Sequence, residues 1–121
     1  KVARLGIYNN GTNLYPGTLL LDAGTVAVDA TGVVAVTISQ ALTKGLYWVA
    51  MLSNGTPATY SHQGYYGALG FLGLVTDSWN RAYNSWIVAQ AYGALPDPFT
   101  AGGTLSYAEQ RVIALRILSL D

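Results

Sequence analysis

Cysteine is absent from this 121-residue chain, so neither a disulfide framework nor a thiolate metal site can form. Charged residues are also scarce, at 10% of the sequence, whereas a typical soluble domain has about 25%. The six Lys and Arg residues balance the six Asp and Glu residues, and the basic residues are scattered along the chain. This distribution argues against a nucleic-acid partner, because such a partner requires clustered basic side chains.

Long hydrophobic runs are missing as well. The longest apolar run, residues 112–118, is interrupted by Arg116, and no segment approaches the roughly 20 apolar residues that span a bilayer. We therefore expect no membrane insertion, and no signal peptide is visible. The abrupt start at Lys1 suggests that a segment upstream of it is missing. A surface this poor in charge favours an extracellular or particle-bound protein.

The sequence offers little catalytic chemistry. His62 is the only histidine, and it could act as a general base or a metal ligand. A catalytic triad also needs an orienting carboxylate and an oxyanion hole, and a zinc site needs several further ligands, so we interpret His62 as a loop residue. The six dispersed carboxylates are Asp22, Asp29, Asp77, Asp97, Glu109 and Asp121. Any two could form a glycosidase pair, but the turn contexts of Asp22, Asp29 and Asp97 favour backbone capping. We predict no enzymatic activity, no catalytic residue, no metal and no cofactor.

Short alternating apolar segments, each ended by Gly, Asn, Asp or Pro, dominate the chain and predict antiparallel strands. The predicted strands are residues 2–8, 19–22, 25–28, 33–39, 46–53, 85–92 and 110–118. The Tyr-Pro-Gly triplet at 15–17 predicts a turn, and Ala23-Gly24 predicts a bulge or a turn. Both faces of the strand at 46–53 are apolar, so we expect it to be central, with Trp48 as a core anchor.

Seven strand candidates separated by turns predict an all-β fold, an antiparallel β-sandwich of jelly-roll type. The whole chain, 1–121, forms one domain in this interpretation. One long, loop-rich insertion covers about residues 54–84, and loops of this length usually carry a function or meet a partner.

Aromatic side chains crowd into this insertion and the strand that follows it. The candidate ligand-binding residues are Tyr60, Tyr65, Tyr66, Trp79, Tyr83 and Trp86. Three interpretations remain open: packing in the core, contacts with other subunits or proteins, and stacking against sugar rings. Core packing is the simplest of the three.

Two smaller patterns are best explained by turn chemistry. Residues 77–80, Asp-Ser-Trp-Asn, resemble the start of a calcium loop but lack the glycine and the distal glutamate of an EF-hand, so an Asx turn is favoured. Residues 10–12 and 54–56 are both Asn-Gly-Thr, which matches the glycosylation acceptor pattern. We interpret both as Asn-Gly turns.

Several of these turn and strand residues also resemble a module of bacteriophage virion proteins, namely tail-fibre, head-fibre and minor structural proteins. The matching segments are RLGIY (4–8), YPG (15–17), LDAG (21–24), TIS (37–39), LT (42–43), GLYW (45–48) and AYGALP (91–96). The resemblance spans most of the chain and fades between residues 56 and 81. It implies a shared architecture and supplies no catalytic residues.

The resemblance implies a non-enzymatic module on the surface of a phage particle, either a fibre domain or a head decoration domain, that serves in virion assembly and host attachment. Its implied partners are other virion proteins and copies of itself, as a homo-oligomer and by analogy a trimer. The alternative is a carbohydrate-binding receptor module, on a fibre tip or on a secreted bacterial protein, that binds a host surface glycan.

Overall fold

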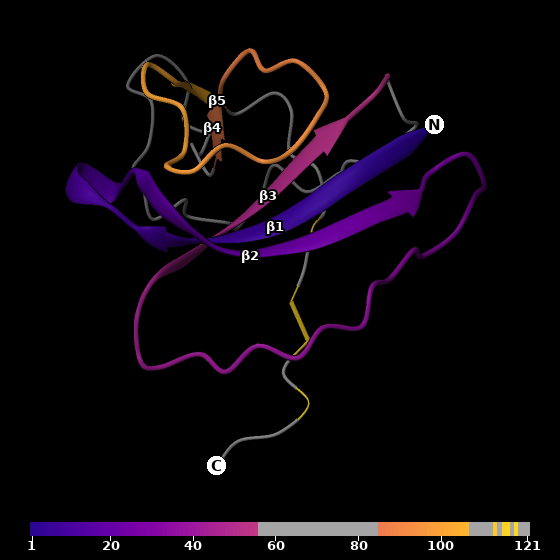
Figure 1. The fold of residues 1–121 in the computed structure, drawn as a ribbon, viewed down its shortest axis with the longest axis horizontal. Helices are drawn as coiled ribbons and strands as arrows, with labels where there is room; N and C mark the ends of the chain where they lie inside the picture. Colours follow the sequence, from indigo (N-terminus) through magenta and orange to yellow (C-terminus); the bar gives the residue numbers. More distant parts are fainter. Residues whose placement is uncertain (56–84, 107–112, 114, 117, 119–121) are drawn as a thin grey trace, which may run out of the picture.

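The computed structural model describes residues 1–55, 85–106, 113, 115, 116 and 118. Its largest element is a three-stranded antiparallel sheet in the order β2-β1-β3. The strands are β1 (Val2–Asn10), β2 (Pro16–Ala27) and β3 (Tyr47–Ser53). They cross the molecule side by side in Figure 1, with β1 between its two partners.

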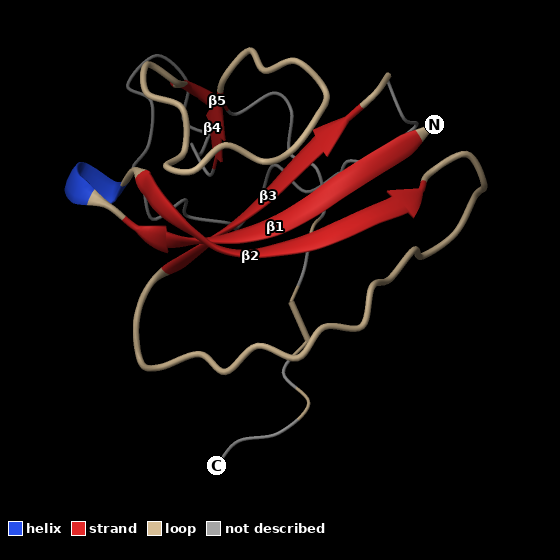
Figure 2. Ribbon diagram, viewed as in Figure 1, coloured by secondary structure: helices blue, strands red, loops and turns tan. Residues whose placement is uncertain are grey.

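A second, smaller sheet pairs β4 (Ser85–Ile87) with β5 (Thr104–Ser106). These strands and the long loop between them are drawn in orange in Figure 1, on one side of the three-stranded sheet. The only helical element in the described part is one 3₁₀ turn, Thr12–Leu14, between β1 and β2 (Figure 2). The all-β antiparallel class is therefore confirmed. The described residues do not show a jelly-roll strand order, which stays a prediction.

Strand β1 pairs with its two neighbours in different ways. The register with β3 is continuous, from Ala3 opposite Ser53 to Asn9 opposite Tyr47. The register with β2 slips by one residue at three places. Each extra residue in β2 bends the strand and increases its twist, as β-bulges do. β2 is therefore the curved edge of the sheet, and β1 with β3 is its regular part.

The predicted bulge or turn at Ala23-Gly24 is a bulge. Leu5 faces Gly24 and the next residue of β1 faces Asp22, so Ala23 is the unpaired residue. Gly24 has a φ of +80°, a conformation that glycine adopts without steric cost. Its N–H donates to Asp22 Oδ1 at 2.9 Å. Because the chain bulges here instead of turning, the two strands predicted at 19–22 and 25–28 form one continuous strand.

Both faces of β1 are buried. Tyr8 lies opposite Trp48 of β3, and these two side chains form a buried cluster with Leu95 from the loop before β5. Partly buried side chains pack against this cluster; they are Leu19, Ala50, Leu52, Trp86 and Phe99. Ala3 and Ile7, which point to the other face of β1, are 0% and 2% exposed. Trp48 is thus a core anchor, as predicted.

The strand at 46–53 exists as β3; among the described residues it pairs with β1, which lies between β2 and β3, and its own central position stays a prediction. One predicted feature of this sheet is wrong. The Tyr-Pro-Gly triplet at 15–17 is no turn, because the chain has already reversed at Asn13 and Leu14, which have φ values of 55° and 54°. Pro16 instead begins β2, a position on an edge strand where its missing N–H costs little.

Other predicted strands are shorter or absent. Residues 33–39 form no strand, and no backbone group of residues 29–45 bonds another described backbone group. Their apolar alternation indicates strand propensity, which is realised only when a neighbour completes the ladder. The strand predicted at 85–92 ends at Ile87, because β5 supplies only three partners. The strand predicted at 110–118 lies mostly outside the described residues, and its four described positions are not in a strand.

Gly6 offers a test of the packing between the sheet and the loop above it. A Cβ at this position would overlap Leu95 Cδ1 and lie 3.0 Å from the Leu21 carbonyl oxygen. Because Leu95 is buried, we expect Gly6→Ala to lower the free energy of unfolding by about 1–3 kcal/mol, the usual cost of overpacking. Urea denaturation measures this change. The control is Gly93→Ala, where a Cβ meets nothing within 4 Å; equal effects of the two variants would contradict the packing described here.

Candidate functional site

Of the six aromatic residues proposed as a ligand site, one can be placed. Trp86 is in β4, whereas Tyr60, Tyr65, Tyr66, Trp79 and Tyr83 lie outside the described residues. The insertion predicted at about 54–84 is described only at its first two positions, and His62 and residues 77–80 also lie outside the described part. The proposed site therefore stays a prediction, apart from what the surroundings of Trp86 show.

Trp86 is held by neighbours within the chain. Its indole Nε1–H donates to the carbonyl oxygen of Leu14 at 2.8 Å. Its ring meets the ring of Tyr15 edge-on, with the centroids 4.8 Å apart. The side chain also packs against the buried cluster around Tyr8. These contacts are those of a partly buried core residue, which is the first of the three interpretations given for the aromatic cluster.

Trp86 is one end of a continuous chain of rings, which we call the aromatic junction and define as Trp86, Tyr15, Phe99 and Tyr8. Tyr15 contacts Phe99 with a centroid distance of 5.6 Å, and Phe99 contacts Tyr8 at 5.3 Å, both edge-to-face. Such pairs each contribute about 0.5–1.5 kcal/mol beyond the area that they bury. The junction joins β1 and the start of β2 to β4 and the loop before β5.

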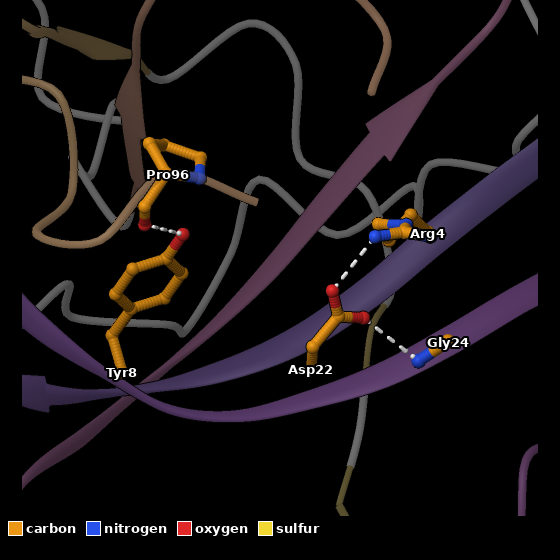
Figure 3. Close-up of polar contacts among 5 residues, drawn as sticks. All are labelled: Arg4, Tyr8, Asp22, Gly24 and Pro96. Carbon is orange, nitrogen blue, oxygen red and sulfur yellow. Dashed lines mark hydrogen bonds and ion pairs between the residues drawn. The ribbon is translucent and has the colours of Figure 1, made fainter. Parts of the chain in front are cut away.

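The two tyrosine hydroxyls of the aromatic junction bind the backbone of that loop. Tyr8 Oη donates to the carbonyl oxygen of Pro96 at 2.8 Å (Figure 3). Tyr15 Oη donates to the carbonyl oxygen of Thr100 at 2.6 Å and accepts the N–H of Gly103 at 2.9 Å. Each hydroxyl fixes a backbone group more than 80 residues away in the sequence. The hydroxyls are therefore occupied by the fold.

The same loop also covers part of the free edge of β2. Asp97 Oδ1 accepts the N–H of Leu19 at 2.9 Å, and the N–H of Phe99 donates to the carbonyl oxygen of Gly17 at 2.9 Å. Covering an edge in this way removes a template for unwanted strand pairing. The predicted backbone capping is confirmed for Asp97, and also for Asp22 through its bond from Gly24. Asp29 is exposed and shows no such bond in the described part.

Arg4 and Asp22 form an ion pair across β1 and β2. Arg4 Nη1 lies 2.8 Å from Asp22 Oδ2, and the two side chains are 27% and 31% exposed. Figure 3 shows Asp22 between Arg4 and Gly24, bonding each with a different oxygen. Arg4 Nε is buried and has no hydrogen-bond partner among the residues that the structure describes. The carboxylate thus braces the bulge, and both of its oxygens are engaged.

Burial changes the acidity of one residue of the junction. Removal of Tyr8 from water, together with the negative charges of Asp97 and Asp22, raises the pKa of Tyr8 from 10.0 to about 12. Tyr8 therefore keeps its proton, and its bond to Pro96, throughout the neutral range.

The described residues contain neither a cluster suited to a metal ion nor a helix suited to a membrane. No group of three or more His, Cys, Asp or Glu side chains comes together there. No helix of that part is long and apolar enough to cross a bilayer.

Sequence reasoning missed Tyr15 and Phe99, which connect the two layers. The signal available was their position beside prolines: Tyr15 precedes Pro16, and Phe99 follows Pro98. An aromatic residue next to a fixed proline φ can be held at low entropic cost. The partner of each ring, however, lies far away in the sequence and becomes visible only in the fold.

Comparisons of the chain with protein-family models, with curated proteins and with solved structures find no match.

Replacing Tyr8 by Phe tests the buried hydroxyl. We expect Tyr8→Phe to lower stability at neutral pH by about 1 kcal/mol, because the Pro96 carbonyl loses its donor. Between pH 10 and about 12 the folded wild type retains a proton that the unfolded chain releases, so its stability falls as the pH rises. The advantage of wild type over Tyr8→Phe should therefore be constant below pH 10 and shrink above it.

Urea denaturation at a series of pH values measures this difference. Tyr92→Phe, at an exposed tyrosine, is the control at neutral pH and should leave stability unchanged. An advantage of wild type that grew above pH 10 would show that the folded state favours ionised Tyr8.

A pair of tryptophan variants separates core packing from ligand binding. Trp86→Ala should lower the free energy of unfolding by about 2–3 kcal/mol, since a partly buried ring and its hydrogen bond are lost. If the carbohydrate interpretation holds, Trp79→Ala should abolish binding on a glycan array and leave the melting temperature nearly unchanged. A Trp86→Ala protein as stable as wild type would contradict the packing of this ring.

Proposed function

We propose that the chain is a non-enzymatic structural module on the surface of a bacteriophage particle, a fibre or decoration domain that acts in virion assembly as a homo-oligomer. The observation that carries this proposal is the position of the core residues in the sequence. Tyr8, Trp48 and Leu95 form the buried cluster. They come from the segments RLGIY, GLYW and AYGALP, three of the segments on which the resemblance to phage virion proteins rests.

A further shared segment and a glycine of the first one also hold structural positions. The segment LDAG at 21–24 contains the bulge of β2, with Asp22 and Gly24 bonded to each other. Gly6, within RLGIY, leaves room for Leu95. Residues that determine packing and bulges support a common architecture and say little about a common ligand. A β-sandwich of jelly-roll type, completed by residues outside the described part, is the fold that we propose for the whole module.

The surface of the long connection between β2 and β3 supports contacts with other subunits. Apolar side chains are exposed along residues 28–46; they are Val33, Val34, Leu42 and Leu46. Asp29 and Lys44 are the only charged residues in this stretch. Exposed apolar side chains that gather on one segment mark an interaction surface more often than isolated ones do.

Sedimentation of the purified chain tests the homo-oligomer. We expect a discrete oligomer, three copies by analogy, that Val34→Lys combined with Leu42→Lys converts to monomer, because charges in an apolar contact are costly. The matched control is Thr31→Lys combined with Ala41→Lys, at two exposed positions of the same segment that carry no large apolar side chain. A wild-type chain that stays monomeric at high concentration would contradict the proposed assembly.

Mass spectrometry of particles purified from a culture of the encoding strain tests the virion assignment. Tryptic peptides of the chain should copurify with the particles in a fixed ratio to the other structural proteins. Peptides found only in the particle-free fraction would overturn the assignment, while leaving the sedimentation result intact.

A further inference from the structure

The chain contains two Asn-Gly steps, Asn10-Gly11 and Asn54-Gly55, whose surroundings differ. In such a step the backbone nitrogen of the glycine can attack the side-chain carbonyl carbon of the asparagine, because no Cβ hinders its approach. The reaction requires a backbone nitrogen that is free to move and an asparagine side-chain carbonyl carbon that this nitrogen can reach. The two steps can therefore be compared by what holds these groups.

Hydrogen bonds hold the side chain of Asn10 and the backbone nitrogen that would attack it. Its Oδ1 accepts the indole N–H of Trp48 at 2.9 Å, and its Nδ2 donates to the Gly11 carbonyl oxygen at 2.9 Å. The N–H of Gly11 donates to the carbonyl oxygen of Tyr15 at 2.7 Å. Trp48 is itself only 8% exposed. Attack at Asn10 would first require these three hydrogen bonds to break.

Asn54 follows the last residue of β3 and is exposed. Its Oδ1 accepts the N–H of Val2 at 2.8 Å, and its own N–H donates to the carbonyl oxygen of Val2 at 3.1 Å. Within the described residues, the backbone N–H of Gly55 donates to nothing. The described residues thus place no hydrogen bond on the nucleophile. The Val2 N–H also points at the oxygen on which negative charge develops, in the manner of an oxyanion-hole donor.

From this contrast we infer that Asn54 is a site of spontaneous deamidation in the folded protein and that Asn10 is protected. The Gly55 nitrogen bonds to Asn54 Cγ and gives up its proton, the Cγ–Nδ2 bond breaks, and ammonia leaves. Water then opens the resulting five-membered succinimide at either carbonyl. The products are aspartate or isoaspartate at position 54, and water is the only co-reactant.

The modification changes the end of the sheet. A carboxylate at position 54 takes the net charge of the chain from +0 to one negative charge. It arises beside the N-terminal residue, since a Cβ on Gly55 would lie 3.7 Å from Lys1 Cδ and Cγ. Isoaspartate also adds a methylene group to the backbone just after the Ala3–Ser53 pair. Both changes fall where β1 begins and β3 ends.

Peptide mapping of the full chain after incubation at mildly alkaline pH tests this inference. Trypsin separates the two steps, because Lys44 lies between them. We expect conversion of amide to acid at Asn54, with separate aspartate and isoaspartate peaks, to be at least about ten-fold faster than at Asn10, because reaction at Asn10 must wait for local opening. Gly55→Ala should slow the reaction at position 54 and leave the folded protein otherwise unchanged.

The same incubation in concentrated urea is the internal control, since it removes the hydrogen bonds that distinguish the two steps. Both asparagines should then react at similar rates, which shows that the difference comes from the fold. Equal rates at Asn10 and Asn54 in the folded protein would overturn the inference. Slow reaction at both in the folded protein, with fast reaction at both in urea, would overturn it as well.

Discussion

The edge-to-face contacts of the aromatic junction are the interaction on which the described structure depends. The apolar face of the three-stranded sheet must be buried against a second layer, and the described part of that layer is mostly loop, with two short strands. Four rings from distant parts of the chain, each touching the next, hold that loop on the sheet. Because the hydroxyls of Tyr8 and Tyr15 bind backbone groups of the loop, the same residues supply apolar contact and satisfy buried polar groups.

The irregularities of β2 follow from the same requirement. A flat edge strand would leave its outer edge open, whereas three single-residue slips curve β2 away from a flat ladder. Near its start, Asp97 and Phe99 then bond the exposed edge. At the bulge, Asp22 accepts a hydrogen bond from Gly24 on one carboxylate oxygen and from Arg4 on the other. Few charges are present in this chain, and those described around the sheet serve its geometry.

Local patterns predicted well what local interactions decide. The strand at 2–8, the interruption at Ala23-Gly24, predicted as a bulge or a turn, and the core position of Trp48 all follow from alternation and turn chemistry. Pairing is a long-range property, so alternation predicted a strand at 33–39 that finds no described partner, and it did not reveal that β1 lies between β2 and β3. Of the candidate site, only Trp86 could be placed, and its hydrogen bond to Leu14 spans 72 residues. No local pattern encodes that contact.

The two Asn-Gly steps show that the same local sequence can differ in reactivity because its tertiary surroundings differ. Both steps invite a turn, and both lie in the same triplet, Asn-Gly-Thr. The difference arises because Tyr8 and Trp48 are opposite each other in the β1–β3 register, which brings the indole N–H of Trp48 to Asn10. Packing of the buried cluster thereby fixes the side chain of Asn10 as well as the sheet. At Asn54 the sheet has ended: Val2 bonds the side-chain oxygen and the backbone N–H of the asparagine, whereas no described residue accepts a bond from the N–H of its glycine neighbour. The rate of deamidation at each step is therefore set by the hydrogen bonds that the fold places on its asparagine and its glycine.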